Sequence, residues 1–143
     1  MEELRYLFNS PGLQIAYDAT NKWLYNQWQG LHDEVSIQVG GLQVYACLAL
    51  QPCTKILSDH SELHGDWHRG DNRLSLRYFN HLAALGVKQF AWVYGPDYRD
   101  RAAMERACCL LTHPEVAIFD DVASAYEWLR QCPVTRERNE PIT

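Results

Sequence analysis

The stretch DEVSIQVGGLQVYACLALQ, residues 33–51, decides the fold, because its apolar residues fit two different structures. Alternation with period two on either side of Gly40-Gly41 is typical of a β-hairpin with a two-glycine turn. Spacings of four, three, four and three are typical of a helix face, which would carry Val35, Val39, Leu42, Ala46 and Ala49. Each glycine costs a helix interior up to ~1 kcal/mol relative to Ala. Periodicity alone leaves both structures open.

The segments around this stretch are easier to interpret. Residues 13–18 and 23–28 are short aromatic-rich runs joined by four residues, which predicts a hairpin. Further on, apolar runs predict strands over 55–59, 89–94 and 116–119. Helical patterns cover 72–85, which stops at Gly86, then 99–111, and a last segment for which Asp120-Asp121 offers an N-cap.

Strands that alternate with helices over residues 55–132 indicate an α/β fold with a parallel or mixed sheet. With a helix over 33–51, the order is β-β-α-β-α-β-α-β-α around a mixed five-stranded sheet. The 143 residues suit one domain, expected over 1–132. Residues 133–143 lack apolar periodicity, so we expect a disordered C-terminal tail.

The composition excludes several classes of partner. The formal net charge of −5 disfavours nucleic acid and anionic membranes, which reward basic surfaces. The sequence has no long apolar span and begins with acidic Met1-Glu2-Glu3, so we expect a cytoplasmic protein without membrane insertion. None of its five cysteines forms a C-x-x-C motif, and buried, reduced thiols are the expectation. We expect no cofactor.

Residues 59–71 concentrate groups that bind or titrate, and they hold three of the six histidines. His60, His64 and His68 are spaced by four, so either a helix or an extended chain could align them with Asp66 for Zn²⁺, and Glu62 is the alternative carboxylate. The order H-x-E-x-H is neither of the known zinc-protease motifs. Gly65 and Gly70 favour a loop, so a metal site at these four residues is the weaker hypothesis. A loop that binds a ligand or partner would use Asp59, Ser61, His64, Asp66, Trp67 and His68.

Several segments together resemble the STAS-like (anti-sigma-factor-antagonist-like, STAS/SEC14-related) small bacterial domains. The resemblance spans about residues 13–131 and is carried by Trp28-Gln29-Gly30, Ile56-Leu57-Ser58-Asp59, Gly65-Asp66-Trp67, Phe90-Ala91-Trp92-Val93, and Phe119-Asp120-Asp121 before Ala125-Tyr126-Glu127-Trp128-Leu129. It favours the helix over 33–51. In signalling members, the loop after the third strand carries a phosphorylatable Ser or Thr, and Ser61 lies in the corresponding region without the usual Asp-Ser-Ser-Gly-like context.

The resemblance implies a non-enzymatic regulatory or binding module for an unknown protein or small ligand, more than an enzyme, and we predict no catalytic residues. One alternative is a small metal-assisted hydrolase that uses the His60–His68 segment. Another is a carrier of a lipid or apolar molecule, although a short chain leaves little room for an acyl cavity. Exposed aromatic residues would support a homodimer.

Overall fold

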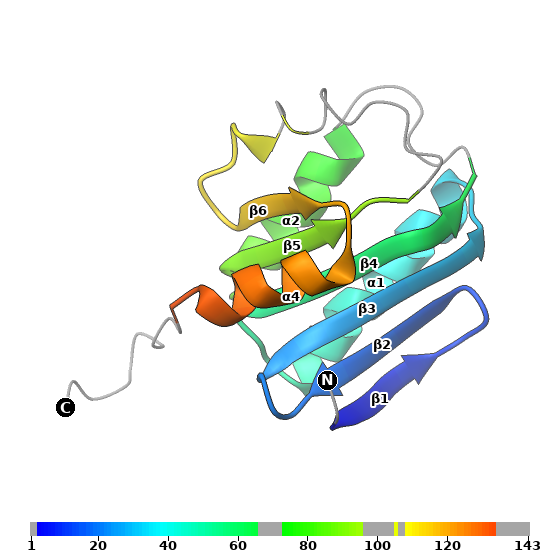
Figure 1. Ribbon diagram of the computed structural model, residues 1–143. Coiled ribbons are helices and arrows are strands. Elements are labelled where there is room, and N and C mark those ends of the chain that lie inside the picture. The colour runs from blue at the N-terminus through cyan, green and yellow to red at the C-terminus, as the bar shows by residue number, and fades with distance from the viewer. Residues whose placement is uncertain (1–2, 66–72, 96–104, 106–107, 134–143) are drawn as a thin grey trace.

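The computed structural model is a six-stranded sheet with helices on both faces (Figure 1), and it describes residues 3–65, 73–95, 105 and 108–133. The elements are β1 (Leu4–Asn9), β2 (Leu13–Asp18), β3 (Trp23–Leu31), α1 (Glu34–Leu50), β4 (Lys55–His64), α2 (Arg73–Ala84), β5 (Gln89–Val93), β6 (Glu115–Phe119) and α4 (Val122–Gln131). The strands lie in the sheet in chain order. Pairs β1–β2 and β2–β3 are antiparallel, and the pairs from β3 to β6 are parallel. The predicted α/β class and mixed sheet are confirmed.

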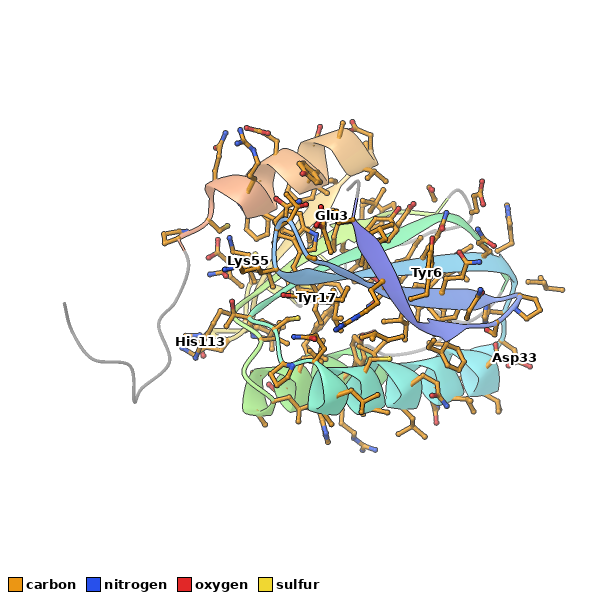
Figure 2. All side chains as sticks on the ribbon, turned by 90° about the horizontal axis from the view of Figure 1, so that it is seen from below. Glu3, Tyr6, Tyr17, Asp33, Lys55 and His113 are labelled. Carbon is orange, nitrogen blue, oxygen red and sulfur yellow. The ribbon has the colours of Figure 1, made fainter. Side chains whose placement is uncertain are left out.

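The two faces of the sheet bury alternate residues of the same strands. Leu24, Ile56 and Phe90 point to the layer of α1 and α2, whereas their neighbours Trp23, Leu57 and Ala91 point to α4. Figure 2 shows α1 and α2 forming one layer and α4 the other. Apolar side chains on both sides of each central strand explain why these strands read as nearly continuous apolar runs.

The sixth strand, β1, was missing from the five-stranded prediction. It pairs with β2 at the edge of the sheet, and its register shifts between Tyr6 and Phe8. Because the shift breaks the alternation of inward and outward side chains, the sequence of β1 carries no clean period of two. Tyr6 is 54% exposed, as an edge position permits.

The predicted helix over 33–51 is confirmed, but its predicted apolar face is not the face that packs on the sheet. Asp33 caps α1 by accepting a hydrogen bond from the Ser36 amide at 2.8 Å. The face turned toward the sheet consists of Gly40, Gly41, Val44, Cys47 and Leu48. The predicted face, Val35, Val39, Leu42, Ala46 and Ala49, lies in solvent.

A close approach to the sheet determines which face of α1 is buried. A Cβ on Gly40 would fall on the indole ring of Trp28, a β3 side chain that is only 4% exposed. A larger residue would hold the helix farther from the sheet. The two glycines thus form contact surfaces, Gly40 against Trp28 and Gly41 against Tyr78. Apolar spacing in the sequence does not reveal such contacts, because glycine has no side chain.

The predicted loop from Asp59 onward is wrong for its first part, because β4 continues to His64. Its last residues, Glu62, Leu63 and His64, pair with the end of β3, from Gln29 to Leu31. This pairing supplies the backbone hydrogen bonds that turn a polar sequence into a strand.

The remaining helix and strand predictions hold where the structure describes them, whereas the expectation of buried thiols is wrong for Cys109, which is exposed. Helix α2 ends before Gly86, whose φ of 103° is the left-handed conformation expected after a helix. Strands β5 and β6 are confirmed, and Asp121 caps α4 through the Ser124 amide at 2.7 Å. Most of the helix predicted over 99–111 and of the tail over 133–143 lies outside the described residues. Among the described helices, none is long and apolar enough to cross a membrane.

Replacing each glycine of α1 with alanine tests the close approach. Gly40→Ala should destabilise the fold by ~1–3 kcal/mol, because the new methyl group overlaps the buried Trp28 ring. Gly41→Ala is the matched control, since its Cβ would lie 3.5 Å from Tyr78, an ordinary contact, and should stabilise the helix by ~0.5–1 kcal/mol. Urea unfolding of the two variants measures both changes in the free energy of unfolding. Equal free energies for Gly40→Ala and Gly41→Ala would contradict the close approach of Gly40 to Trp28.

Candidate functional site

A pocket of about 390 Å³ lies between α1, α2 and the face of β3, β4 and β5 that these helices cover. Its walls are largely aromatic and aliphatic, from Trp28, Ile37, Leu42, Tyr45, Tyr78, Phe79, Phe90 and Trp92. Ser58 and His60 contribute polar groups from β4, and Glu34 and Arg77 contribute charges. The volume lies within the range of ~300–1,000 Å³ that is usual for small-molecule sites.

The helix-side wall is built from aromatic contacts between α1 and α2. Tyr45 of α1 stacks on His81 of α2 with ring centroids 4.0 Å apart, and it lies 5.7 Å from Tyr78. Tyr78 in turn meets Phe90 of β5 edge to face at 6.2 Å. Gly41 lines the pocket without a side chain of its own, so space remains where the two helices face each other.

Two polar residues of β4 lie among these apolar groups, and they contact each other. Ser58 Oγ and His60 Nε2 share a hydrogen bond of 2.8 Å, and their side chains are 1% and 8% exposed as whole residues. Residues two apart on a strand project to the same face, which brings the pair to the pocket. The His60 ring lies 5.8 Å from the Trp28 ring and 5.4 Å from the Trp92 ring.

The environment of His60 keeps its imidazole uncharged. Burial is the main cause that lowers the pKa of His60 to about 3, and the nearby His32 adds a smaller electrostatic contribution. A neutral ring suits the space between two indoles. A general base works best when its pKa lies near the working pH, so this histidine is poorly suited to take the proton of Ser58 at neutral pH.

The charges of the pocket lie on side chains that are open to solvent. Glu34 of α1 and Arg77 of α2 are both exposed, and their opposite signs leave no net charge between them. Burial raises the pKa of Tyr78, which therefore remains a neutral phenol. The inner surface is thus apolar with neutral polar groups.

Asn26 adds a further buried polar group next to the Ser58–His60 pair. It is 0% exposed and pairs with Ser58 across β3 and β4. Within the described part of the chain, neither its Nδ2 nor its Oδ1 has a hydrogen-bond partner. Buried polar groups nearly always have one.

Among the residues predicted from the 59–71 segment, those that the structure describes do not gather at one place. Asp59 lies on the opposite face of the sheet, where it accepts hydrogen bonds from Tyr25 Oη at 3.4 Å and from the Ser61 amide at 2.9 Å. Ser61 is an exposed residue inside β4, not at the start of a helix. His64 is exposed, and its carbonyl accepts a hydrogen bond from the His32 amide at 2.8 Å. Asp66, Trp67 and His68 lie outside the described residues.

His60 and His64 do not lie on the same face of β4. Register between β3 and β4 shifts after Asp59, where two residues of β4 stand against one of β3. An extra residue reverses the inward and outward order, so His60 is buried and His64 is exposed. Among the described residues, no three His, Cys, Asp or Glu side chains are placed to share a metal ion.

The pocket residues were visible in the sequence as core residues only. Trp28, Phe90 and Trp92 carried the family resemblance, Tyr78 lay on the apolar face of the helix predicted over 72–85, and Tyr45 had no distinguishing signal. The available signal was Ser58, a hydroxyl inside an apolar strand at even spacing from Ile56 and His60. A polar residue on a buried strand face indicates either a satisfied core group or a binding site.

Comparison with solved structures supports the fold. The chain is similar to the crystal structure of an uncharacterized protein from the DUF3478 family with a SpoIIAA-like fold, from Shewanella loihica PV-4. The TM-score is 0.54 at 21% sequence identity, over 85% of this chain and 97% of that one. The chain therefore has a SpoIIAA-like, STAS-like fold. No protein-family model matches the sequence, and no curated protein matches it.

The buried His60 predicts how stability depends on pH. An unfolded histidine titrates near pH ~6.5, whereas the folded pKa of His60 is about 3. Between these values the unfolded state binds more protons, so the free energy of unfolding should fall as pH falls, by up to ~1.4 kcal/mol per pH unit from this group.

Urea unfolding from pH 7 to pH 4 measures this effect. His60→Gln should reduce the slope of stability against pH, whereas the matched variant His64→Gln retains His60 and should retain the slope. An unchanged slope in His60→Gln would mean that the ring is protonated inside the fold.

Proposed function

We propose that the protein is a non-enzymatic module that binds a small, mainly apolar molecule in the pocket between α1, α2 and the sheet. The observation that supports this most is a cavity of about 390 Å³ with aromatic and aliphatic walls in a chain of 143 residues. A ligand there would replace the water in contact with these walls. Burial of apolar area is worth ~25 cal/mol per Å².

The polar groups of the pocket suggest what the ligand carries. Ser58 and His60 are neutral, and the neighbouring Asn26 amide has no hydrogen-bond partner among the described residues. A charged ligand end at this depth would lack a counter-charge, which is costly. We therefore expect a flat or aliphatic body with one uncharged polar group, such as a hydroxyl or carbonyl, directed toward β4.

The chemistry of the same residues favours binding over hydrolysis. Ser58 and His60 form a hydrogen-bonded pair like that of a nucleophile and its base. The low pKa of His60, about 3, removes the basicity that this reaction requires at neutral pH. The metal-assisted alternative finds no support in the positions of His60 and His64.

An uncharged fluorescent probe tests the proposal directly. N-phenylnaphthylamine is aromatic and neutral, and we expect it to bind with a Kd of ~1–100 µM, which corresponds to ~5–8 kcal/mol. Its fluorescence should rise on binding. Trp28 and Trp92 line the pocket, so tryptophan emission should change at the same concentrations.

Gly41→Leu is the decisive variant, because it adds a side chain at the pocket wall where a Cβ meets only ordinary contacts. It should weaken probe binding at least ~10-fold, equal to ~1.4 kcal/mol. Ala123→Leu places a leucine side chain on the exposed side of α4 and should leave binding unchanged. Equal binding by wild type and a folded Gly41→Leu variant would show that the probe binds elsewhere.

A further inference from the structure

The outer face of α1, turned away from the sheet, carries an uninterrupted line of apolar side chains. Its members, called the α1 seam below, are Val35, Val39, Leu42, Ala46 and Ala49, and all are exposed. Val35, Val39 and Leu42 are 68%, 51% and 60% exposed. Figure 2 shows the side chains of this helix that project outward from the molecule.

The spacing of the seam matches a helix–helix contact. Steps of four, three, four and three residues keep the side chains on one narrow line along the helix, as at the a and d positions of a coiled coil. The opposite side of α1 already packs on the sheet through Gly40, Val44, Cys47 and Leu48. The helix thus has one apolar face that packs in the core of the chain and a second apolar face, the α1 seam, that is exposed and spaced as in a helix–helix contact.

The charges along α1 favour a partner that is equally apolar. After Glu34, the helix contains no charged residue as far as Leu50. A helix with one face in solvent ordinarily carries charged and polar residues there. The net charge of −5 thus arises outside this face, so two copies can approach through it without repulsion between opposed charges.

The sizes of the seam residues favour a second copy in a defined orientation. The first half of the seam carries the larger Val35 and Val39, and the second half carries Ala46 and Ala49. When two such helices run antiparallel, the larger half of each faces the smaller half of the other, with Leu42 near the centre. A two-fold axis makes such a patch complementary to itself. Antiparallel packing also keeps the two Glu34 carboxylates at opposite ends of the helix pair. The two helix dipoles then point in opposite directions, which is favourable.

We propose that two copies of the chain associate through the α1 seam, with the two α1 helices antiparallel about a two-fold axis near Leu42. Leu42 belongs to both the seam and the pocket wall, whereas Val35, Val39, Ala46 and Ala49 do not line the pocket, so the dimer does not rest on the proposed function. A helix of 17 residues is ~25 Å long. One helix pair of that length is small beside the ~1,200–2,000 Å² of stable interfaces, so association is weak, with a Kd of ~10–100 µM.

Sedimentation equilibrium over ~1–500 µM measures the association. The mass of the wild-type protein rises from that of one chain to that of two across this range. Ala46→Glu places a carboxylate in the seam and raises the Kd at least ~10-fold. The matched variant Ala123→Glu adds the same charge to the exposed side of α4 and associates as wild type does. A wild-type protein that stays monomeric throughout overturns the proposal, as does undiminished association of Ala46→Glu.

Disulfide trapping tests the orientation. In a Cys109→Ser background, which removes the exposed thiol, chains with Val39→Cys are mixed with chains with Ala46→Cys under mild oxidation. The antiparallel arrangement gives mixed V39C–A46C dimers in excess over V39C–V39C dimers. The reverse ratio overturns the antiparallel dimer.

Discussion

The contact of α1 with the sheet at Gly40 is the constraint on which the helix-side layer depends. Without a side chain at this position, the helix backbone comes down onto the buried Trp28 ring of β3. This contact directs Val44, Cys47 and Leu48 into the core. It also fixes one wall of the pocket, because Trp28 contacts the helix and lines the cavity. Gly41, one residue on, leaves the space that Tyr45 and Tyr78 enclose.

The chemistry of the pocket follows from where β4 runs. This strand lies inside the sheet, so alternate residues are enclosed on both faces. Ser58 and His60 face the helices, whereas Asp59 faces the other way toward Tyr25. The acidic residue of this segment is thereby separated from the imidazole by the thickness of the sheet backbone. An imidazole buried among indoles loses basicity, and what remains is a neutral polar group in an apolar space.

Much of the fold could be predicted from the sequence, because most elements are specified locally. The β2–β3 hairpin, strands β5 and β6, and the capped helix α4 each have a clear period and end signals. Strand β4 beyond Asp59 could not be predicted in this way. Its polar sequence is extended because the end of β3 supplies hydrogen-bond partners, and that pairing joins segments 33 residues apart, such as Leu31 with His64.

The candidate site was less predictable for a related reason. Counting histidines pointed to residues 59–71, where charged and polar groups are dense along the chain. The pocket instead assembles single residues from five elements, among them Trp28, Tyr45, Ser58, Tyr78 and Trp92. Each of these residues fits a core position when considered alone. Only their arrangement around an unfilled volume distinguishes a site from a core.

Helix α1 shows what periodicity does and does not determine. The spacing of Val35, Val39 and Leu42 predicted a helix correctly, yet these residues face solvent. Periodicity reports that a helix has an apolar line, and it is silent on what lies against that line. The face with Gly40 packs on the sheet because glycine allows the helix to come closer, and a closer approach brings more atoms into contact. The packing of one chain therefore does not explain the exposed apolar line of the α1 seam. Its regular spacing is explained if a second chain packs against it.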